Sequence, residues 1–483
     1  GYHGLMEENA TPTALCAPEG NAAPAGALLD AHAGDASAHD KRLTDANITD
    51  SDATDASPTD GRPASERPTV LVVHASVGSG HRSAANAVGQ ALELVRDNAE
   101  EAASLGISAP ADLNVEVLDI LEFGRIVFDG DKTASMFTGF TRPVYDLTWR
   151  YTLTGRLLWA GGTAWARVMY PKFVEYVRKT RPLAIVCTHI TAANVAVSAR
   201  MITGMAFPIL CVPTDYEIEG LWPHLHTDLF CVANEYMAET LRPRRVPEDR
   251  ILITGIPARP AFRKAYDRAA TRERFGLPQN ARVVLALAGA KLPRPYVHFR
   301  ESLDQLIPYL HTFEGMHLVV VAGTNVEYAR HVRRLAADHG LKNVTVLEYV
   351  EDMAALMAAS DLVLCKSGGL TVTECLCAGV PMILMGRAYG QEKANVRMLT
   401  AAGAALHVTT ARELVDTLRH VSEHPESTKA MLVNASFMRR PNAALDIARA
   451  ALDLAAAEPS TDAALRRKHF LHFYWGHKPA HTR

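Results

Sequence analysis

Residues 361–395 read DLVLCKSGGLTVTECLCAGVPMILMGRAYGQEKAN, and their pattern decides the fold class. The apolar run LVLC has the length of a strand and ends in the small-residue turn SGG, after which a helical pattern begins at Thr371. A second apolar run, PMILM, ends in another polar loop before the segment that starts at Gln391. Short apolar strands that alternate with helices predict a parallel sheet covered on both faces.

The same alternation extends over most of the chain. Further strand-like runs that end in polar residues are TVLVVHAS, NVEVLDI, LAIVCTH, ILCVPTD, LFCVAN and ILITGIP in the first half, and VVLALAG, HLVVVAG and VTVLEY in the second. The stretch IPARPAFRKAYDR separates the two series. We therefore predict an α/β protein with two doubly wound, Rossmann-like domains, an N-terminal one over 67–262 and a C-terminal one over 263–457.

The two ends of the chain differ from these domains in composition. Residues 1–66 are rich in Ala, Asp, Thr, Pro and Ser and nearly lack aromatic residues. Such a segment buries too little apolar surface to offset its ordering entropy, so we predict a disordered extension. Residues 458–483 form a basic–aromatic tail that contains LRRKHFLHFYWGHKPAHTR. The tail is interpreted either as a membrane contact or simply as an exposed chain end.

Composition excludes several classes of protein. The net charge of -3 over 483 residues gives no global attraction to nucleic acid. No apolar run reaches the roughly 18 residues that span a bilayer, and we see no secretion signal. The seven cysteines are scattered without a CxxC pair, which favours reduced thiols over a disulfide framework or a zinc site. These features predict a cytoplasmic protein.

A glycine-rich turn follows the first strand-like run, in HASVGSGHRSAANAV at residues 74–88. Gly78 and Gly80 allow a sharp turn, and His81 stands where the turn becomes a helix. The dinucleotide fingerprint fails because Ser83 occupies the position of its third glycine, and the P-loop fails because no Gly-Lys-Ser/Thr follows. His81 is therefore either a polar helix cap or a general base, since imidazole titrates near neutral pH.

The segment 361–395 also brings together polar groups that suit a phosphate and a sugar. Its helix begins near Thr371 with free N–H groups that favour an anion, and Glu374 lies one turn further, where a carboxylate suits ribose hydroxyls. Taken alone, Glu374 equally fits a solvated helix residue. The residues that we assign to this donor site are Ser367, Gly368, Gly369, Thr371, Glu374, Gln391, Glu392 and Asn395.

These motifs make the resemblance specific. KSGGLTVTE and YGQEKAN resemble the donor site of GT-B glycosyltransferases, and of the group containing monogalactosyldiacylglycerol synthases and bacterial processive diacylglycerol glucosyltransferases, which is glycosyltransferase family 28-like. The group's glycine turn is matched by GSGHRSAANAV, its Thr-Asp element by PTDYEIEGLWPHLHTDLFCVANEYM and its Gly-Ile-Pro turn by TGIPARPAF. The resemblance implies a GT-B fold, in which two Rossmann-like domains face each other across a cleft.

The resemblance also implies a mechanism. A nucleotide-sugar donor, UDP-linked, would bind the second domain, with its nucleobase against the backbone near Tyr349 and Val350. The acceptor would enter from the first domain and lose its proton to His81 as the anomeric carbon is attacked with inversion. Asp215 would orient the acceptor or His81, or itself serve as the base. We expect no metal ion, because the helix dipole and backbone donors would neutralise the leaving diphosphate.

Two further residues are assigned to the acceptor side. Trp222 belongs to the Thr-Asp element, and His189 follows a strand in CTHITAAN, where a structural histidine is the competing interpretation. The chain departs from the group at three places. Glu219 stands where relatives often have His, Lys291 lies within AGAKLPRPY instead of a glycine-rich turn, and Tyr389 replaces the usual Pro before Gly-Gln-Glu.

Residues 136–181 carry eight basic and two acidic residues together with three of the five tryptophans. Aromatic side chains beside arginines suit an anionic lipid interface, although ordinary helix packing with a solvated basic face explains the pattern too. We therefore predict peripheral binding to the cytosolic face of a membrane. The residues assigned to this contact are Trp149, Trp159, Trp165, Arg150 and Arg156.

The predicted function is transfer of a hexose from a UDP-sugar to a diacylglycerol-type lipid, which forms a glycolipid. Three alternatives stay open: N-acetylglucosaminyl transfer to a polyprenyl-linked acceptor, a nucleotide-sugar epimerase, and a degenerate regulator that binds nucleotide sugar or lipid. The epimerase would not need the basic–aromatic patch, and the regulator would bind donor without turnover.

Overall fold

In the computed structural model, the described residues are 67–77, 79–125, 168–218, 222–244, 246–289 and 297–468. Within them, no helix is both long enough and apolar enough to cross a bilayer. Several predictions concern other parts of the chain and stay predictions: the extension 1–66, the residues assigned to the membrane contact, Gly78, and the departures at Glu219 and Lys291.

The predicted α/β class is confirmed by two six-stranded sheets in which every pairing is parallel. The first sheet has the order β2-β1-β3-β4-β5-β6 and the second β12-β11-β10-β7-β8-β9. The strands are β1 (Thr69–His74), β2 (Asn114–Asp119), β3 (Ala184–Cys187), β4 (Ile209–Cys211), β5 (Leu229–Val232), β6 (Ile251–Ile253), β7 (Arg282–Leu287), β8 (Met316–Val321), β9 (Val344–Leu347), β10 (Leu362–Cys365), β11 (Met382–Met385) and β12 (Leu406–Val408).

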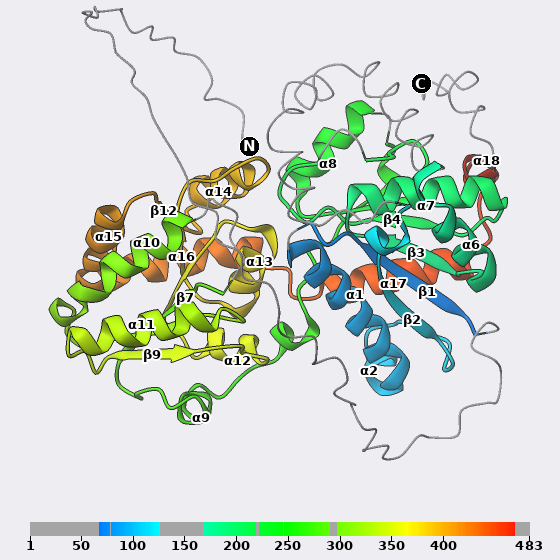
Figure 1. The fold of residues 1–483 in the computed structure, drawn as a ribbon. Coiled ribbons are helices and arrows are strands. Elements are labelled where there is room, and N and C mark those ends of the chain that lie inside the picture. The colour runs from blue at the N-terminus through cyan, green and yellow to red at the C-terminus, as the bar shows by residue number, and fades with distance from the viewer. Residues whose placement is uncertain are drawn as a thin grey trace, which may run out of the picture. The chain divides into compact units, whose positions relative to one another are not determined.

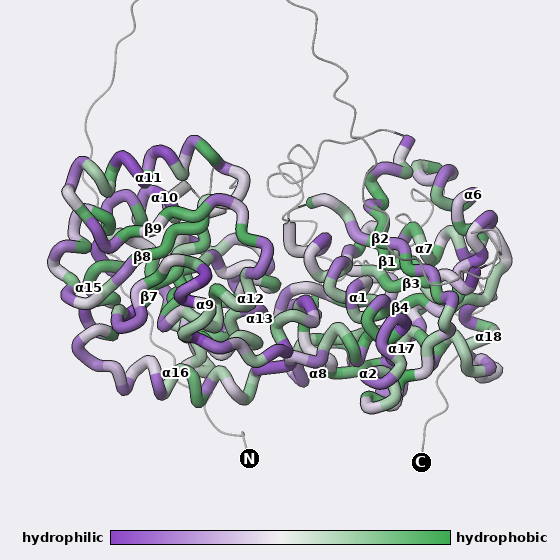
Figure 2. Tube along the Cα trace, turned by 90° about the horizontal axis from the view of Figure 1, so that it is seen from below, coloured by the Kyte–Doolittle hydropathy of each residue, from purple (hydrophilic) through white to green (hydrophobic). Residues whose placement is uncertain are grey.

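Helices cover both faces of each sheet (Figure 1). They are α1 (Ser79–Asp97), α2 (Ala99–Ser104), α6 (Pro171–Thr180), α7 (Ile190–Thr203), α8 (Glu235–Leu241), α9 (Arg268–Arg274), α10 (Val297–Leu306), α11 (Val326–Asp338), α12 (Met353–Ala358), α13 (Gly369–Ala378), α14 (Glu392–Ala401), α15 (Ala411–Glu423), α16 (Pro425–Met438), α17 (Ala443–Ala456) and α18 (Thr461–Lys468). Figure 2 shows that hydrophobic residues concentrate along the strands, while helices such as α11 carry hydrophilic stretches.

Burial along the strands explains why the sequence reads as apolar runs. In β1, Leu71 and Val73 pack into the core beneath α6, α7 and α8, while Val70 and Val72 pack into the core beneath α1 and α17. Both faces of the strand are therefore dry, so its residues are apolar without alternation. β12 was not predicted, because this strand has three residues and is half-buried over its first two, Leu406 and His407.

The predicted C-terminal domain, which ends at residue 457, includes a helix that packs on the other sheet. α17 was predicted to complete the second domain, but Ala444, Leu445 and Ala448 lie in the same core as α1 and the strands of the first sheet. Arg449 of α17 also donates a hydrogen bond to the backbone carbonyl of Leu105, which follows α2. The chain therefore returns to the first sheet after α16, as Figure 1 shows for α17 beside α1.

Candidate active site

Three neighbouring strands of the first sheet end at one place, and each contributes polar residues there. β1 leads into α1, which carries His81; β3 is followed by Thr188 and His189; β4 is followed by Thr214 and Asp215. The strand order reverses between β1 and β3. Ligands of doubly wound sheets bind beyond the carboxyl ends of the strands at such a switch point, so the topology itself selects this position.

His81 lies inside the first turn of α1 and not in the turn before it, because the helix already begins at Ser79. Its Nδ1 is 2.9 Å from the carbonyl oxygen of Thr188 and 3.0 Å from Oγ1 of Thr214. A carbonyl oxygen only accepts hydrogen bonds, so Nδ1 carries the proton and donates it. The lone pair is therefore on Nε2. His81 is consequently held in the tautomer that a general base needs.

Burial and a neighbouring charge act in opposite directions on the pKa of His81. Burial lowers the pKa of His81 below its usual value, and the negative charge of Asp215 partly offsets this effect. A lowered pKa keeps the imidazole neutral near pH 7, which is the form that accepts a proton. Asp215 then stabilises the imidazolium that forms when the proton arrives.

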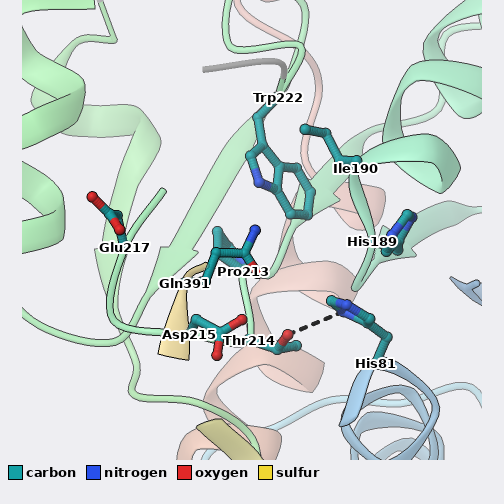
Figure 3. A pocket seen from close by; sticks show the side chains of 9 residues that line it. All are labelled: His81, His189, Ile190, Pro213, Thr214, Asp215, Glu217, Trp222 and Gln391. Carbon is teal, nitrogen blue, oxygen red and sulfur yellow. Dashed lines mark hydrogen bonds between the residues drawn. The ribbon is translucent and has the colours of Figure 1, made fainter. Parts of the chain in front are cut away.

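A small cavity of about 30 Å³ opens at this position. Its walls combine residues from the first half of the chain with Gln391, which precedes α14 in the second half (Figure 3). The lining residues are His81, His189, Ile190, Pro213, Thr214, Asp215, Glu217, Trp222 and Gln391. Five of these were assigned to the site from sequence, and the pocket brings them together. Thr214 and Glu217 were not foreseen.

The donor-side turn follows β10, next to β11 in the second sheet. Lys366 ends the strand region and its Nζ lies 3.1 Å from Oε1 of Glu392 at the start of α14. Ser367 is buried and its hydroxyl donates to the other carboxylate oxygen of Glu392 at 3.5 Å. Gly368 caps α13 without a side-chain hydrogen bond, so the free N–H groups of the first turn keep their capacity to bind an anion.

Gly369 allows a very close approach between the two halves of the chain. A Cβ built on Gly369 would lie 1.9 Å from the carbonyl oxygen of Thr214 and 3.0 Å from Oδ1 of Asp215. Real Cβ atoms essentially never come closer than 3.0 Å to another heavy atom. The SGG turn therefore contacts the loop that carries Asp215, and a glycine is required for that contact. Gly80 has no such constraint, since its nearest neighbour is a Leu370 methyl at 3.8 Å.

Asn395 is fully buried and fixes the same contact. Its Nδ2 donates to Oδ1 of Asp215 at 2.8 Å and to the carbonyl oxygen of Ser367 at 2.9 Å, and its Oδ1 accepts from the backbone N–H of Tyr216 at 2.9 Å. The structure does not support the predicted donor contact at Asn395, because its amide is used within the protein. Asn395 is instead a positioning residue for Asp215.

Glu374 lies in α13 and is half-buried. Burial raises the pKa of Glu374 to about 7, although the positive charge of Arg259 opposes the shift. Arg259 belongs to the Gly-Ile-Pro segment that links the two halves of the chain. Thr371, in the first turn of the same helix, is half-buried too. The ionisation of a carboxyl group with a pKa near 7 changes readily when the hydroxyl groups of a ligand donate hydrogen bonds to it.

Two predicted residues have less structural support. Tyr349 and Val350 follow β9 at the edge of the second sheet, and the Tyr349 side chain is 73% exposed. Because the prediction concerned their backbone, it stays a prediction. Trp222, in contrast, is buried in the pocket wall, where its ring stacks edge-on against Phe230 at 6.4 Å.

Each half of the chain matches a known family model. Residues 81–258 match the family model described as monogalactosyldiacylglycerol (MGDG) synthase, and residues 301–447 match the glycosyltransferase family 28 C-terminal domain. The chain is therefore similar to an MGDG synthase domain in its first half and to a family 28 C-terminal domain in its second half. The segment that matches the MGDG synthase model contains the assigned acceptor-side residues His81, His189, Asp215 and Trp222. The segment that matches the family 28 model contains Gly369, Glu374 and the rest of the assigned donor site.

Curated relatives agree with this assignment. The chain is 30% identical over 243 residues to a processive diacylglycerol beta-glucosyltransferase of Bacillus subtilis, which covers 50% of this chain and 62% of the relative. It is 28% identical over 253 residues to a protein of the same name from Staphylococcus carnosus, which covers 52% of this chain and 62% of the relative. The chain thus spans about three fifths of these relatives.

Solved structures support the GT-B-like fold. The chain resembles S. aureus MnaA in a co-structure with UDP, with a TM-score of 0.51 and 13% identity over 81% of this chain and 99% of that one. It resembles the UDP-GlcNAc 2-epimerase of Neisseria meningitidis bound to UDP-GlcNAc, with a TM-score of 0.51 and 15% identity over 80% of this chain and 100% of that one. At these identities the likeness concerns the fold alone.

Proposed function

We propose that the protein is an inverting glycosyltransferase that moves a hexose from a UDP-sugar to a diacylglycerol-type membrane lipid. The observation that carries the proposal is the pocket in which His81, with its Nε2 lone pair available, lies beside Asp215 and faces Gln391 of the family 28 domain. A base from the acceptor side and a polar group from the donor side therefore line one cavity. The names of the curated relatives support the lipid acceptor.

The proposed reaction balances with these groups. The acceptor hydroxyl gives its proton to Nε2 of His81 while its oxygen forms a bond to the anomeric carbon. The bond from that carbon to the diphosphate breaks, and its electron pair leaves with the phosphate oxygen. Attack from the face opposite to the leaving group inverts the anomeric centre. Asp215 stabilises the imidazolium, and its own position is fixed by Asn395.

The donor side is proposed to act through backbone dipoles. The diphosphate would bind the N-terminus of α13, where the half-buried Gly368 adds no side chain over the backbone, and Glu374 would accept the ribose hydroxyls. Lys366 adds a positive charge beside the same turn. We propose that these groups neutralise the leaving group without a metal ion. Gln391 and Glu392 would contact the sugar, and the backbone near Tyr349 and Val350 the nucleobase.

Peripheral attachment to the cytosolic face of a membrane is part of the proposal. The described end of the basic stretch is α6, whose outer face carries Lys172, Arg178 and Lys179 exposed to solvent, followed by exposed Arg181. One of these charges is paired, since Arg178 lies 2.6 Å from Glu175. The remaining excess of positive charge suits an anionic lipid surface.

The direct test is transfer of label from a panel of radiolabelled UDP-sugars into a total lipid extract. Wild-type protein is expected to transfer label from one UDP-hexose into the organic phase, and Glu374→Ala is expected to lose that transfer. No labelled lipid from any donor, with wild-type protein that still binds UDP, would contradict the proposal and favour an epimerase or a regulatory binder.

A further inference from the structure

His189 lies against His81, and hydrogen bonds fix the tautomers of both imidazoles in opposite ways. The ring centroids are 4.6 Å apart and the rings are nearly perpendicular, at 83°. Nδ1 of His189 accepts the backbone N–H of Thr191 at 3.1 Å, since His189 is the N-cap of α7. A backbone N–H only donates, so Nδ1 of His189 is unprotonated and its proton is on Nε2.

The two rings therefore offer one acceptor and one donor. His81 donates through Nδ1 to Thr188 and keeps a lone pair on Nε2, whereas His189 accepts through Nδ1 and keeps a hydrogen on Nε2. Both side chains line the same pocket (Figure 3). Burial and the neighbouring histidines hold the pKa of His189 well below its usual value, so it stays neutral near pH 7.

We propose that His189 is a catalytic residue that donates a hydrogen bond from Nε2 to the oxygen of the acceptor hydroxyl while His81 takes the proton of that hydroxyl. The inference rests on the proposed function and extends it with a second residue at the reacting oxygen. An alcohol needs one acceptor for its proton and offers lone pairs to one donor, and the pair of tautomers supplies both.

The hydrogen bond from His189 becomes stronger as the reaction proceeds. Negative charge develops on the acceptor oxygen as its proton moves to His81, so a neutral N–H aimed at that oxygen binds the transition state better than the ground state. His189 itself transfers no proton. Its role resembles that of one donor in an oxyanion hole, whose removal typically lowers the rate about a hundredfold or more.

The test uses a variant that keeps the helix cap. Asn is a preferred N-cap residue, so His189→Asn retains an acceptor for the Thr191 N–H but is too short to present a donor at the position of the imidazole Nε2. We expect about a hundredfold lower kcat/KM for the acceptor, with unchanged UDP affinity and thermal unfolding. His189→Ala, which also removes the cap, should lower the unfolding temperature too. Wild-type kcat/KM in His189→Asn would overturn the inference.

A second measurement separates this inference from the proposed function. Nitrogen-15 NMR of the wild-type imidazoles at pH 7.5 or above distinguishes the two tautomers, with signals assigned through His81→Ala and His189→Asn. We expect the proton on Nδ1 of His81 and on Nε2 of His189. The same tautomer in both rings would overturn the inference even in an active enzyme. Opposite tautomers in a protein without transferase activity would instead contradict the proposed function.

Discussion

Replacing Gly369 by Ala tests the close contact between the SGG turn and the Thr214–Asp215 loop. The new Cβ would start 1.9 Å from the Thr214 carbonyl oxygen and must move to at least 3.0 Å, so the two segments must separate by about 1.1 Å. Shifts of this kind in packed regions cost about 1–3 kcal/mol, and a misplacement of about 1 Å at a reacting centre costs about a hundredfold in rate. Gly369→Ala is therefore expected to lose most transferase activity.

Gly368→Ala is the matched control for steric conflict, because a Cβ on Gly368 meets its nearest atom, Oε1 of Glu392, at an ordinary 3.6 Å. The assay compares thermal unfolding, UDP binding and transfer rate in the two variants and wild type. We expect a lower unfolding temperature for Gly369→Ala and a near-normal one for Gly368→Ala. A Gly369→Ala protein that unfolds and transfers sugar like wild type would refute the close approach.

Three further predictions follow from the same site. Asn395→Ala leaves the buried Tyr216 N–H without its partner, so it should destabilise the protein by about 1–3 kcal/mol in unfolding experiments; unchanged unfolding would contradict the bridge. UDP affinity should fall about tenfold from pH 8 to pH 6 as Glu374, with its pKa of about 7, becomes protonated, and Glu374→Gln should flatten that profile. Asp215→Asn removes the charge that raises the pKa of His81, so the acid limb of the rate profile should move to lower pH, and an upward shift would argue against this coupling.

Much of the fold was predictable because strands buried on both faces leave continuous apolar runs. Polar residues that follow these runs or begin the next helix, among them His81, Asp215 and Ser367, lie at strand ends as expected. The sequence pattern of a helix does not predict which sheet the helix packs against. α17 has an apolar face, but nothing in its periodicity says that this face covers the first sheet and not the second.

The missed features of the site depend on tertiary contacts. Thr188 and Thr214 act on His81 through a backbone carbonyl and a hydroxyl, and threonines after a strand are too common to single out. Asn395 was assigned to the donor site because it lies one turn beyond Gln391 on the same helical start. Only the fold reveals that its amide faces Asp215 and Ser367 instead.

The central claim is that His81 accepts the proton of a lipid hydroxyl during sugar transfer. The most direct measurement is the initial rate of hexose transfer from a UDP-sugar to diacylglycerol in vesicles containing anionic lipid, for wild type and His81→Ala at equal UDP occupancy. We predict transfer by the wild type, and a loss of at least about a hundredfold in His81→Ala with unchanged UDP affinity. Equal rates in the two proteins, or no transfer by the wild type, would contradict the account.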